Sequence, residues 1–319
     1  MILKPLPQAG AFSRLAIPYL TIMSNLRLVI EERARNIGNF LVARLLPFSQ
    51  QCTIGPFIYI DHMGPVDLSA NETFDVPPHP HIGLSTLTYL LEGDVMHRDS
   101  IGTEQRISPG AVNWMTAGKG VVHSERTPAD LRGKPQRMHG LQIWVALPAA
   151  DEDMEPYFSH VEAGALPAWT ENGVQFRLVA GEFGDLRAGV PVHSRLYLLE
   201  ISSEHDAYLA PGDRLYGESG LYILEGEVEA DGEWFGPRQL LVAQNPALCA
   251  FRVKAGTRLY LLGGEPLGEH RYIDWNFVSS RTERIDQARA DWTAKRFPAI
   301  AGETDNIPMP ERPPGFKWT

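Results

Sequence analysis

Short runs of apolar and β-branched residues, separated by glycine, proline and other turn residues, recur along most of the chain. Such short runs, bounded by turn residues, are typical of β-strands. The strands predicted in the first half are 26–31, 40–46, 57–60, 78–91, 95–99, 111–115, 121–125 and 139–147, and 101–106 resembles a hairpin. The strands predicted in the second half are 174–180, 195–202, 221–229, 239–243, 248–253 and 257–262.

The pattern changes to a helical period only after residue 280. Ser280 is a candidate N-cap for a helix over 281–295, because serine side chains accept hydrogen bonds from the first free N–H groups of a helix. The residues at helical spacing are Ile285, Ala288, Trp292 and Lys295. The last twenty or so residues are rich in proline and are expected to be extended. The chain is therefore predicted to be all-β with a short C-terminal helix.

An internal repeat indicates that the β-rich part is duplicated. The sequence Tyr-Leu-Leu-Glu-Gly-Asp-Val at 89–95 returns as Tyr-Ile-Leu-Glu-Gly-Glu-Val at 222–228, with five of seven positions identical. Short strands at regular spacing, present twice, predict two β-barrel or sandwich domains. The predicted parts are an N-terminal extension at 1–24 that is a candidate for disorder, a barrel at 25–150, a linker at 151–170, a second barrel at 171–280, and the helix with its extended tail at 281–319.

Composition and charge exclude several classes of partner. The chain has 29 lysines and arginines against 39 acidic residues, and a net charge of −10 argues against binding to a nucleic-acid backbone. The chain has only two cysteines, Cys52 and Cys249, far apart in sequence, so we expect no disulfide framework and a reducing compartment. No apolar run approaches the roughly 20 residues of a membrane span. We therefore expect a cytoplasmic protein without a signal peptide, and Met23 is an alternative start.

Two short stretches carry the candidate chemistry. His79 and His81 stand at i and i+2, and so do His123 and Glu125. Side chains two residues apart on a strand point to the same face. If the two strands face each other across a barrel, three imidazoles and one carboxylate converge as metal ligands with open coordination positions. The places matching these four residues in the second copy are Gly212, Arg214, Ala250 and Arg252, so the second barrel is predicted to bind no metal.

The ligand types leave the identity of the metal open. Imidazole suits zinc, copper, iron and nickel alike. The absence of cysteine ligands argues against a closed structural zinc site. We expect one divalent ion, with Fe(II) favoured and Mn, Ni, Co, Cu and Zn as alternatives.

Other residues are candidates for supporting roles, and each has an ordinary structural alternative. His97 and His139 are candidates to orient the metal ligands, because ligating histidines usually donate their second N–H to a neighbour. The alternative for each is a histidine at a strand edge with a local hydrogen bond. Gln142, Trp114 and Met115 are candidates to line a pocket over the metal, although an aromatic or methionine in a barrel is more often part of the core.

Several of these motifs resemble the pirin family. They are His-Pro-His-x-Gly at 79–83, Tyr-Leu-Leu-Glu-Gly at 89–93, Trp-Met-Thr-Ala-Gly-Lys-Gly-Val-Val-His-Ser-Glu at 114–125 and His-Gly-Leu-Gln-Ile-Trp-Val at 139–145. The resemblance extends from about residue 37 to 309. It implies a bicupin, a protein of two cupin-type barrels. It also implies a single metal, usually iron, in the N-terminal barrel, held by the residues matching His79, His81, His123 and Glu125.

The resemblance implies two functions. Some bacterial pirins are quercetin 2,3-dioxygenases, whereas others are redox-responsive proteins that bind transcription regulators or metabolic enzymes. We expect an enzyme that opens a flavonol-like substrate with O₂ and releases carbon monoxide, with Glu125 as general base. The alternative is a metal-dependent protein that docks on a partner protein. Ile82, Leu84 and Ser85 replace the arginine, aromatic and glutamate of the animal-type pattern, which argues against the animal-type regulatory surface.

Overall fold

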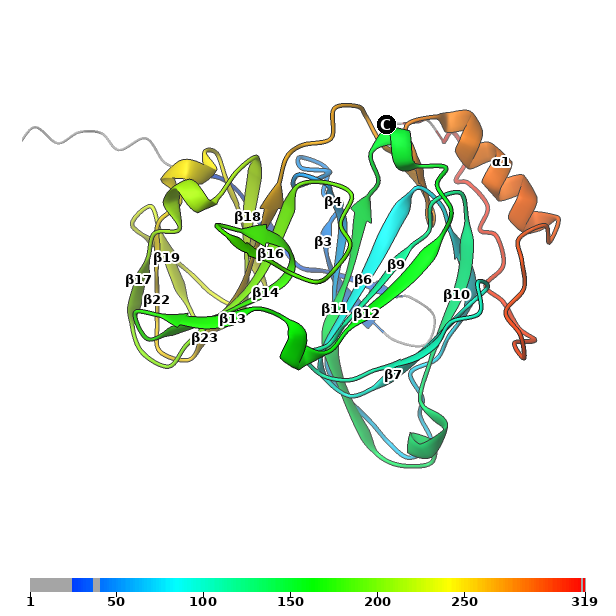
Figure 1. Ribbon diagram of the computed structural model, residues 1–319, viewed down its shortest axis with the longest axis horizontal. Coiled ribbons are helices and arrows are strands. Elements are labelled where there is room, and N and C mark those ends of the chain that lie inside the picture. The colour runs from blue at the N-terminus through cyan, green and yellow to red at the C-terminus, as the bar shows by residue number, and fades with distance from the viewer. Residues whose placement is uncertain (1–24, 37–40, 317, 319) are drawn as a thin grey trace, which may run out of the picture.

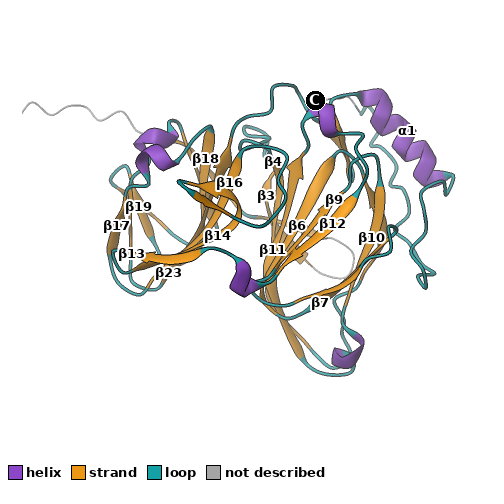
Figure 2. Ribbon diagram, in the orientation of Figure 1, coloured by secondary structure: helices purple, strands orange, loops and turns teal. Residues whose placement is uncertain are grey.

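The computed structural model describes residues 25–36, 41–316 and 318, and its strands form two β-barrels that lie side by side (Figure 1). Strands dominate both barrels, and the helices are α1 and a few short 3-10 turns (Figure 2). The predicted fold class, all-β with a short C-terminal helix, is therefore confirmed. The N-terminal extension predicted for 1–24, with its alternative start at Met23, lies outside the described residues.

The N-terminal barrel is built from a seven-stranded sheet of order β12-β9-β6-β11-β4-β3-β2 and a four-stranded sheet of order β5-β10-β7-β8. The strands of the larger sheet are β2 (Arg33–Asn36), β3 (Leu41–Leu46), β4 (Phe57–Leu68), β6 (Leu84–Glu92), β9 (Val112–Thr116), β11 (Gln136–Ala146) and β12 (Tyr157–Val161). The strands of the smaller sheet are β5 (Val76–His81), β7 (Val95–Asp99), β8 (Glu104–Ile107) and β10 (Val121–Arg126).

The C-terminal barrel repeats this plan with a larger sheet of order β1-β21-β18-β23-β16-β14-β13, in which β15 also pairs with β14, and a smaller sheet of order β17-β22-β19-β20. The strands of the larger sheet are β1 (Leu26–Glu31), β13 (Ala168–Glu171), β14 (Val174–Phe183), β15 (Leu186–Arg187), β16 (Leu196–Ser203), β18 (Glu218–Glu225), β21 (Gln239–Ala243) and β23 (Thr257–Gly264). The strands of the smaller sheet are β17 (Ala207–Leu209), β19 (Val228–Ala230), β20 (Glu233–Phe235) and β22 (Phe251–Val253).

The first described strand, β1, belongs to the C-terminal barrel, where Val29 lies opposite Leu241 of β21. The structure therefore differs from the prediction that residues 25–150 form the N-terminal barrel. The apolar pattern of a segment predicts a strand, but the partner of that strand is set by contacts distant in sequence. The other predicted domain boundaries stay predictions.

The predicted strand 78–91 is two strands, because the chain turns sharply at Gly83. This glycine has a φ of +68°, and a Cβ added to it would lie 2.0 Å from the carbonyl oxygen of Val278. Both the left-handed backbone and the close approach require a residue without a side chain. The turn moves the chain from the smaller sheet, in β5, to the larger sheet, in β6.

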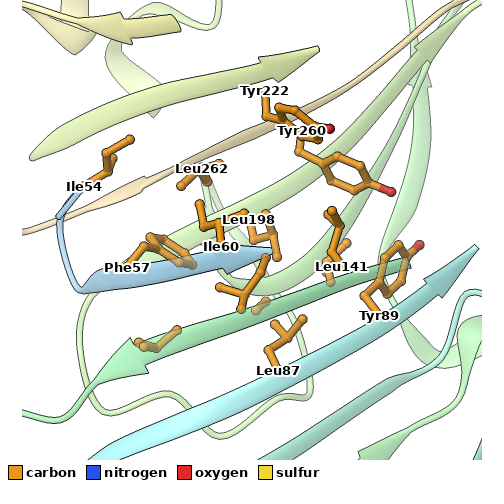
Figure 3. Packing of buried hydrophobic residues seen from close by; sticks show 14 of the residues in the cluster. Ile54, Phe57, Ile60, Leu87, Tyr89, Leu141, Leu198, Tyr222, Tyr260 and Leu262 are labelled. Atoms are coloured by element: carbon orange, nitrogen blue, oxygen red, sulfur yellow. The ribbon is translucent and has the colours of Figure 1, made fainter. Parts of the chain in front are cut away.

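One continuous apolar core joins the two barrels (Figure 3). Leu87, Tyr89 and Leu141 come from the larger N-terminal sheet, and Leu198 and Tyr260 come from the larger C-terminal sheet. All five are buried. Full burial of a large apolar side chain stabilises a fold by about 1.5–3 kcal/mol. The shared core therefore fixes the two barrels against each other.

The helix α1 (Thr282–Thr293) begins one residue after the start predicted at residue 281. The predicted N-cap Ser280 is wrong, because its N–H and hydroxyl both donate to the carboxylate of Glu152, at 2.7 and 3.1 Å. The N-cap is Arg281, whose side chain makes no capping hydrogen bond.

Within the described residues, no helix has the length and apolar character needed to cross a membrane.

A buried ion pair holds the segment that returns from the C-terminal to the N-terminal barrel, through β24 (Tyr272–Asp274) and β25 (Phe277–Ser279). Oε1 of Glu152 lies 3.1 Å from Nε of Arg271, and both side chains are almost fully buried. Oε2 of Glu152 accepts a hydrogen bond from the Ser279 hydroxyl at 2.8 Å. The carboxylate thus ties both ends of the β24–β25 hairpin to the N-terminal barrel.

Replacing Glu152 with alanine is expected to lower the free energy of unfolding by about 3–5 kcal/mol, because the Arg271 guanidinium would remain buried without its partner. Chemical denaturation monitored by circular dichroism measures this change. The control is Glu155→Ala, because Glu155 is exposed and pairs with Lys119 at the surface. Loss of an exposed pair is expected to cost less than about 1 kcal/mol. Equal losses in the two variants would contradict a stabilising role for the buried pair.

Candidate metal centre

The three candidate histidines come from two neighbouring strands of the smaller N-terminal sheet. β5 and β10 pair antiparallel, with His123 opposite His79 and Val121 opposite His81. The two strands are therefore neighbours in one sheet, and the condition that they face each other across the barrel is not met. The period of two along a strand shows which side chains share a face, but it does not show whether two strands are neighbours or lie opposite.

The imidazoles converge on one point inside the barrel. One ring nitrogen from each of His79, His81 and His123 lies within 4.8 Å of the other two. The Nε2 atoms of His81 and His123 are 3.1 Å apart. Within the part of the chain that the structure describes, no other group of three metal-ligating side chains meets this criterion.

These three rings suit a metal ion because burial keeps them neutral. Burial lowers the pKa of His79 to about 4, and it lowers the pKa of His81 and of His123 well below the ordinary value. A neutral imidazole offers a lone pair to a metal. The carbonyl of Pro77 accepts a hydrogen bond from Nδ1 of His79 at 2.8 Å, which leaves the lone pair of that ring on Nε2. The donor set therefore fits a divalent metal.

Glu125 lies in the same cavity but outside this group of three. The register of β5 against β10 shifts between His123 and Glu125, so the carboxylate does not follow the regular ladder. Burial raises the pKa of Glu125 to about 7, against the opposing effect of a hydrogen bond from the Thr88 hydroxyl at 3.3 Å. A carboxyl group with a pKa near neutrality can take up and release a proton in the working range of pH.

The histidines and Glu125 open into a cavity of about 570 Å³. Its aromatic wall is formed by Tyr59 and Trp144, whose rings are stacked with centroids 3.9 Å apart. The guanidinium of Arg44 lies over the Tyr59 ring at 4.2 Å and pairs with Asp61 at 2.8 Å. Burial raises the pKa of Asp61 to about 6, although Arg44 opposes this rise. The remaining lining residues are Asn36, Asp75, Val76, Pro77, Gln142, Trp275, Asn276, Asn306, Ile307 and Pro308.

The supporting candidates have different outcomes. Gln142 lines the cavity, and its Oε1 lies 2.9 Å from the Thr88 hydroxyl. His97 contacts a candidate ligand, because its Nδ1 lies 3.4 Å from Nδ1 of His123.

The other three supporting candidates do not line the cavity. His139 is bonded to His62 at 2.9 Å. Trp114 belongs to the core shared by the barrels, and Met115 packs with Ala117 and Val121 in a small cluster. The bulk that makes a tryptophan or methionine suitable for a pocket wall makes it equally suitable for a core.

Sequence reasoning missed most of the cavity wall. Trp144 stands two residues after Gln142 on β11, so the two side chains share a face. This spacing could have predicted that Trp144 lines the same cavity as Gln142. Tyr59 and Asp61 lie opposite Trp144 and Gln142 on β4. Nothing in the local sequence signals the wall that comes from 275–276 and 306–308, because those segments reach the cavity only through the fold.

Comparisons with known proteins agree with this architecture. The family model described as Pirin matches residues 39–145, and the model described as Pirin C-terminal cupin domain matches residues 199–298. A pirin-like protein of Caulobacter vibrioides is 44% identical over 290 residues, which cover 89% of this chain and 99% of that protein. A Pseudomonas aeruginosa protein named "Putative quercetin 2,3-dioxygenase PA1205" is 36% identical over 265 residues, which cover 82% of each.

A solved structure with the same architecture is that of quercetin 2,3-dioxygenase from Acinetobacter baumannii. It superposes with a TM-score of 0.82 at 32% sequence identity, covering 91% of this chain and 97% of that chain. The two matched family regions lie one in each barrel. The chain therefore belongs to the pirin family and is built from two cupin-type domains.

Proposed function

We propose that this protein is a metal-dependent dioxygenase that opens flavonols such as quercetin with O₂ and releases carbon monoxide. The observation that carries the proposal is the set of three buried, neutral imidazoles opening with Glu125 into an aromatic-walled cavity. Its volume of about 570 Å³ suits a small molecule of flavonol size. The names of the Pseudomonas relative and the Acinetobacter structure support the same chemistry.

The proposed ligands are His79, His81, His123 and Glu125, for one divalent ion. Fe(II) is favoured, and Mn, Ni, Co, Cu and Zn are the alternatives. When bound, the ion supplies a Lewis acid that lowers the pKa of a coordinated hydroxyl. Among the described residues that line the cavity there is no cysteine, which is consistent with imidazole and carboxylate ligation.

The protein side chains position the substrate and move its proton. Glu125 is the proposed general base, because its carboxylate lies in the same cavity as the three imidazoles, where it can take the proton of the flavonol 3-hydroxyl. In the metal-free site, burial raises the pKa of Glu125 to about 7. The stacked Tyr59 and Trp144 offer a flat aromatic wall for the fused rings of the substrate. Gln142 and Asn276 add polar groups that can orient the substrate hydroxyls. The resulting electron-rich flavonolate reacts with O₂, and one ring carbon leaves as carbon monoxide.

A cytoplasmic location is part of the proposal. Its support is that Cys52 and Cys249 are both free thiols, as expected in a reducing compartment. The predicted lack of a nucleic-acid partner stays a prediction.

The purified protein is expected to contain about one divalent ion per chain, and His81→Ala is expected to lose most of it. Removing one imidazole leaves an incomplete donor set in a buried site. Elemental analysis of protein loaded with Fe(II) under anaerobic conditions measures the metal content. His205→Ala is the control, because His205 is exposed and lies in the C-terminal barrel. Full metal content in His81→Ala would place the metal elsewhere.

Metal-loaded protein is expected to release carbon monoxide from quercetin in air, and Glu125→Gln is expected to lose about 10²–10⁴-fold in kcat, the usual contribution of a general base. Glutamine keeps the size of the side chain but does not accept the proton. Gas chromatography of carbon monoxide measures turnover, and metal content is measured in parallel. Unchanged turnover in this variant, at equal metal content, would remove Glu125 as the base.

The competing function is a metal-dependent protein that docks on a partner protein. The relative with 44% identity is named only as pirin-like, which leaves this function open. Wild-type protein that holds its metal but releases no carbon monoxide with Fe, Mn, Co, Ni or Cu would favour docking. A partner captured in only one oxidation state of the metal would then identify it.

A further inference from the structure

We propose that Asp99 and His97 are positioning residues that select which ring nitrogen of His123 faces the metal. They form a relay of hydrogen bonds that runs from Asp99 through His97 to His123. The inference rests on the proposed metal centre, but the relay itself can be tested in protein without metal. Neither residue lines the cavity, so both act on the centre through His123.

The relay consists of two buried contacts. Nδ1 of His123 lies 3.4 Å from Nδ1 of His97, and Nε2 of His97 lies 3.1 Å from Oδ2 of Asp99. His97 and Asp99 stand at i and i+2 on β7, which pairs with β10 beside the candidate ligands. All three residues are at least 96% buried. Water therefore has little access to either contact.

The loop after β7 fixes the end of the relay. Oδ1 of Asp99 accepts hydrogen bonds from the backbone N–H of Ile101 at 3.1 Å and of Thr103 at 2.9 Å. Burial raises the pKa of Asp99, but the hydrogen bonds from His97 and Thr103 outweigh burial and hold that pKa below its ordinary value. Asp99 is therefore ionised at neutral pH and can only accept.

The hydrogen positions along the relay follow from this fixed end. Because Asp99 only accepts, Nε2 of His97 carries a hydrogen, and the proposed relay assigns the lone pair of that ring to Nδ1. That lone pair accepts the hydrogen on Nδ1 of His123. The Nε2 atom of His123, which faces His81 at 3.1 Å, then keeps its own lone pair for the metal. The stacking of Phe158 on the His97 ring, with centroids 4.6 Å apart, holds the plane of that ring.

His123 differs from His79 in the kind of group that sets its tautomer. The acceptor for His79 is the carbonyl of Pro77, which belongs to the backbone. The acceptor for His123 is another imidazole, whose direction of donation depends on Asp99. A change of one atom at residue 99 is therefore sufficient to reverse the relay.

Asp99→Asn is the decisive variant. The two backbone N–H groups hold the amide oxygen of the new side chain, so its NH₂ group faces Nε2 of His97. Nε2 must then accept, Nδ1 of His97 must carry the hydrogen, and Nδ1 of His123 must accept it. The hydrogen of His123 moves to Nε2, and the lone pair for the metal is lost. Loss of such an outer partner typically weakens metal binding about 10–100-fold.

Two measurements test this directly. Imidazole ¹⁵N–¹H correlation spectra of metal-free protein are expected to show His123 with its hydrogen on Nδ1 in the wild type and on Nε2 in Asp99→Asn. Competition titrations with Zn(II) and with anaerobic Fe(II) are expected to show about 10–100-fold weaker binding in the variant. Asp94→Asn is the matched control, because Asp94 bonds Arg106 and Ser108 and takes no part in the relay.

Two further variants separate positioning from folding. His97→Gln keeps an acceptor and a donor in one side chain and is expected to keep more metal affinity than His97→Leu. An unchanged His123 tautomer in Asp99→Asn would overturn the relay, and so would metal affinity within about twofold of the wild type, given the expected loss. If the wild type binds neither metal but the His123 tautomer still differs between the wild type and Asp99→Asn, the proposed function would be wrong and the relay would stand.

Discussion

The antiparallel pairing of β5 with β10 is the constraint on which the candidate site depends. It places His79 directly opposite His123 and brings His81 within reach of both. A slip of one residue would turn the side chains of one strand to the other face and separate the ligands. The left-handed turn at Gly83 follows β5 directly and moves the chain to the larger sheet just after His81.

Burial sets the protonation states of the three candidate histidine ligands and of Glu125. In water, imidazoles with ordinary pKa values would be partly protonated near neutral pH and would compete poorly for a metal. Inside the barrel, desolvation favours the neutral ring and, by the same effect, favours the protonated form of Glu125. One physical cause thus prepares both a set of metal ligands and a carboxyl group able to exchange a proton. Thr88 donates a hydrogen bond to Glu125, and His97 contacts His123.

The second barrel packs against the sheet that carries part of the candidate site. Its larger sheet shares a core with the sheet that carries Thr88 and Gln142, so the back of the cavity rests on a packed apolar layer. The chain that leaves this barrel then crosses back, anchored by Glu152, and supplies Trp275 and Asn276 to the cavity wall. The two copies therefore differ: the candidate ligands lie in the N-terminal barrel, and the chain that leaves the C-terminal barrel adds Trp275 and Asn276 to the cavity wall.

The sequence by itself determined the strands, the duplication and the pairs of potential ligands, because alternation along a strand and the spacing of histidines are local properties. It also predicted the family, through motifs that are continuous in the chain. Tertiary structure alone decided that β5 and β10 are neighbours, that β1 belongs to the second barrel, and that His139 bonds His62. The cavity wall from 306–308 was equally beyond the sequence. Pairing and packing join residues far apart in the chain, and no local pattern specifies which distant segment will pair with a given strand or pack against it.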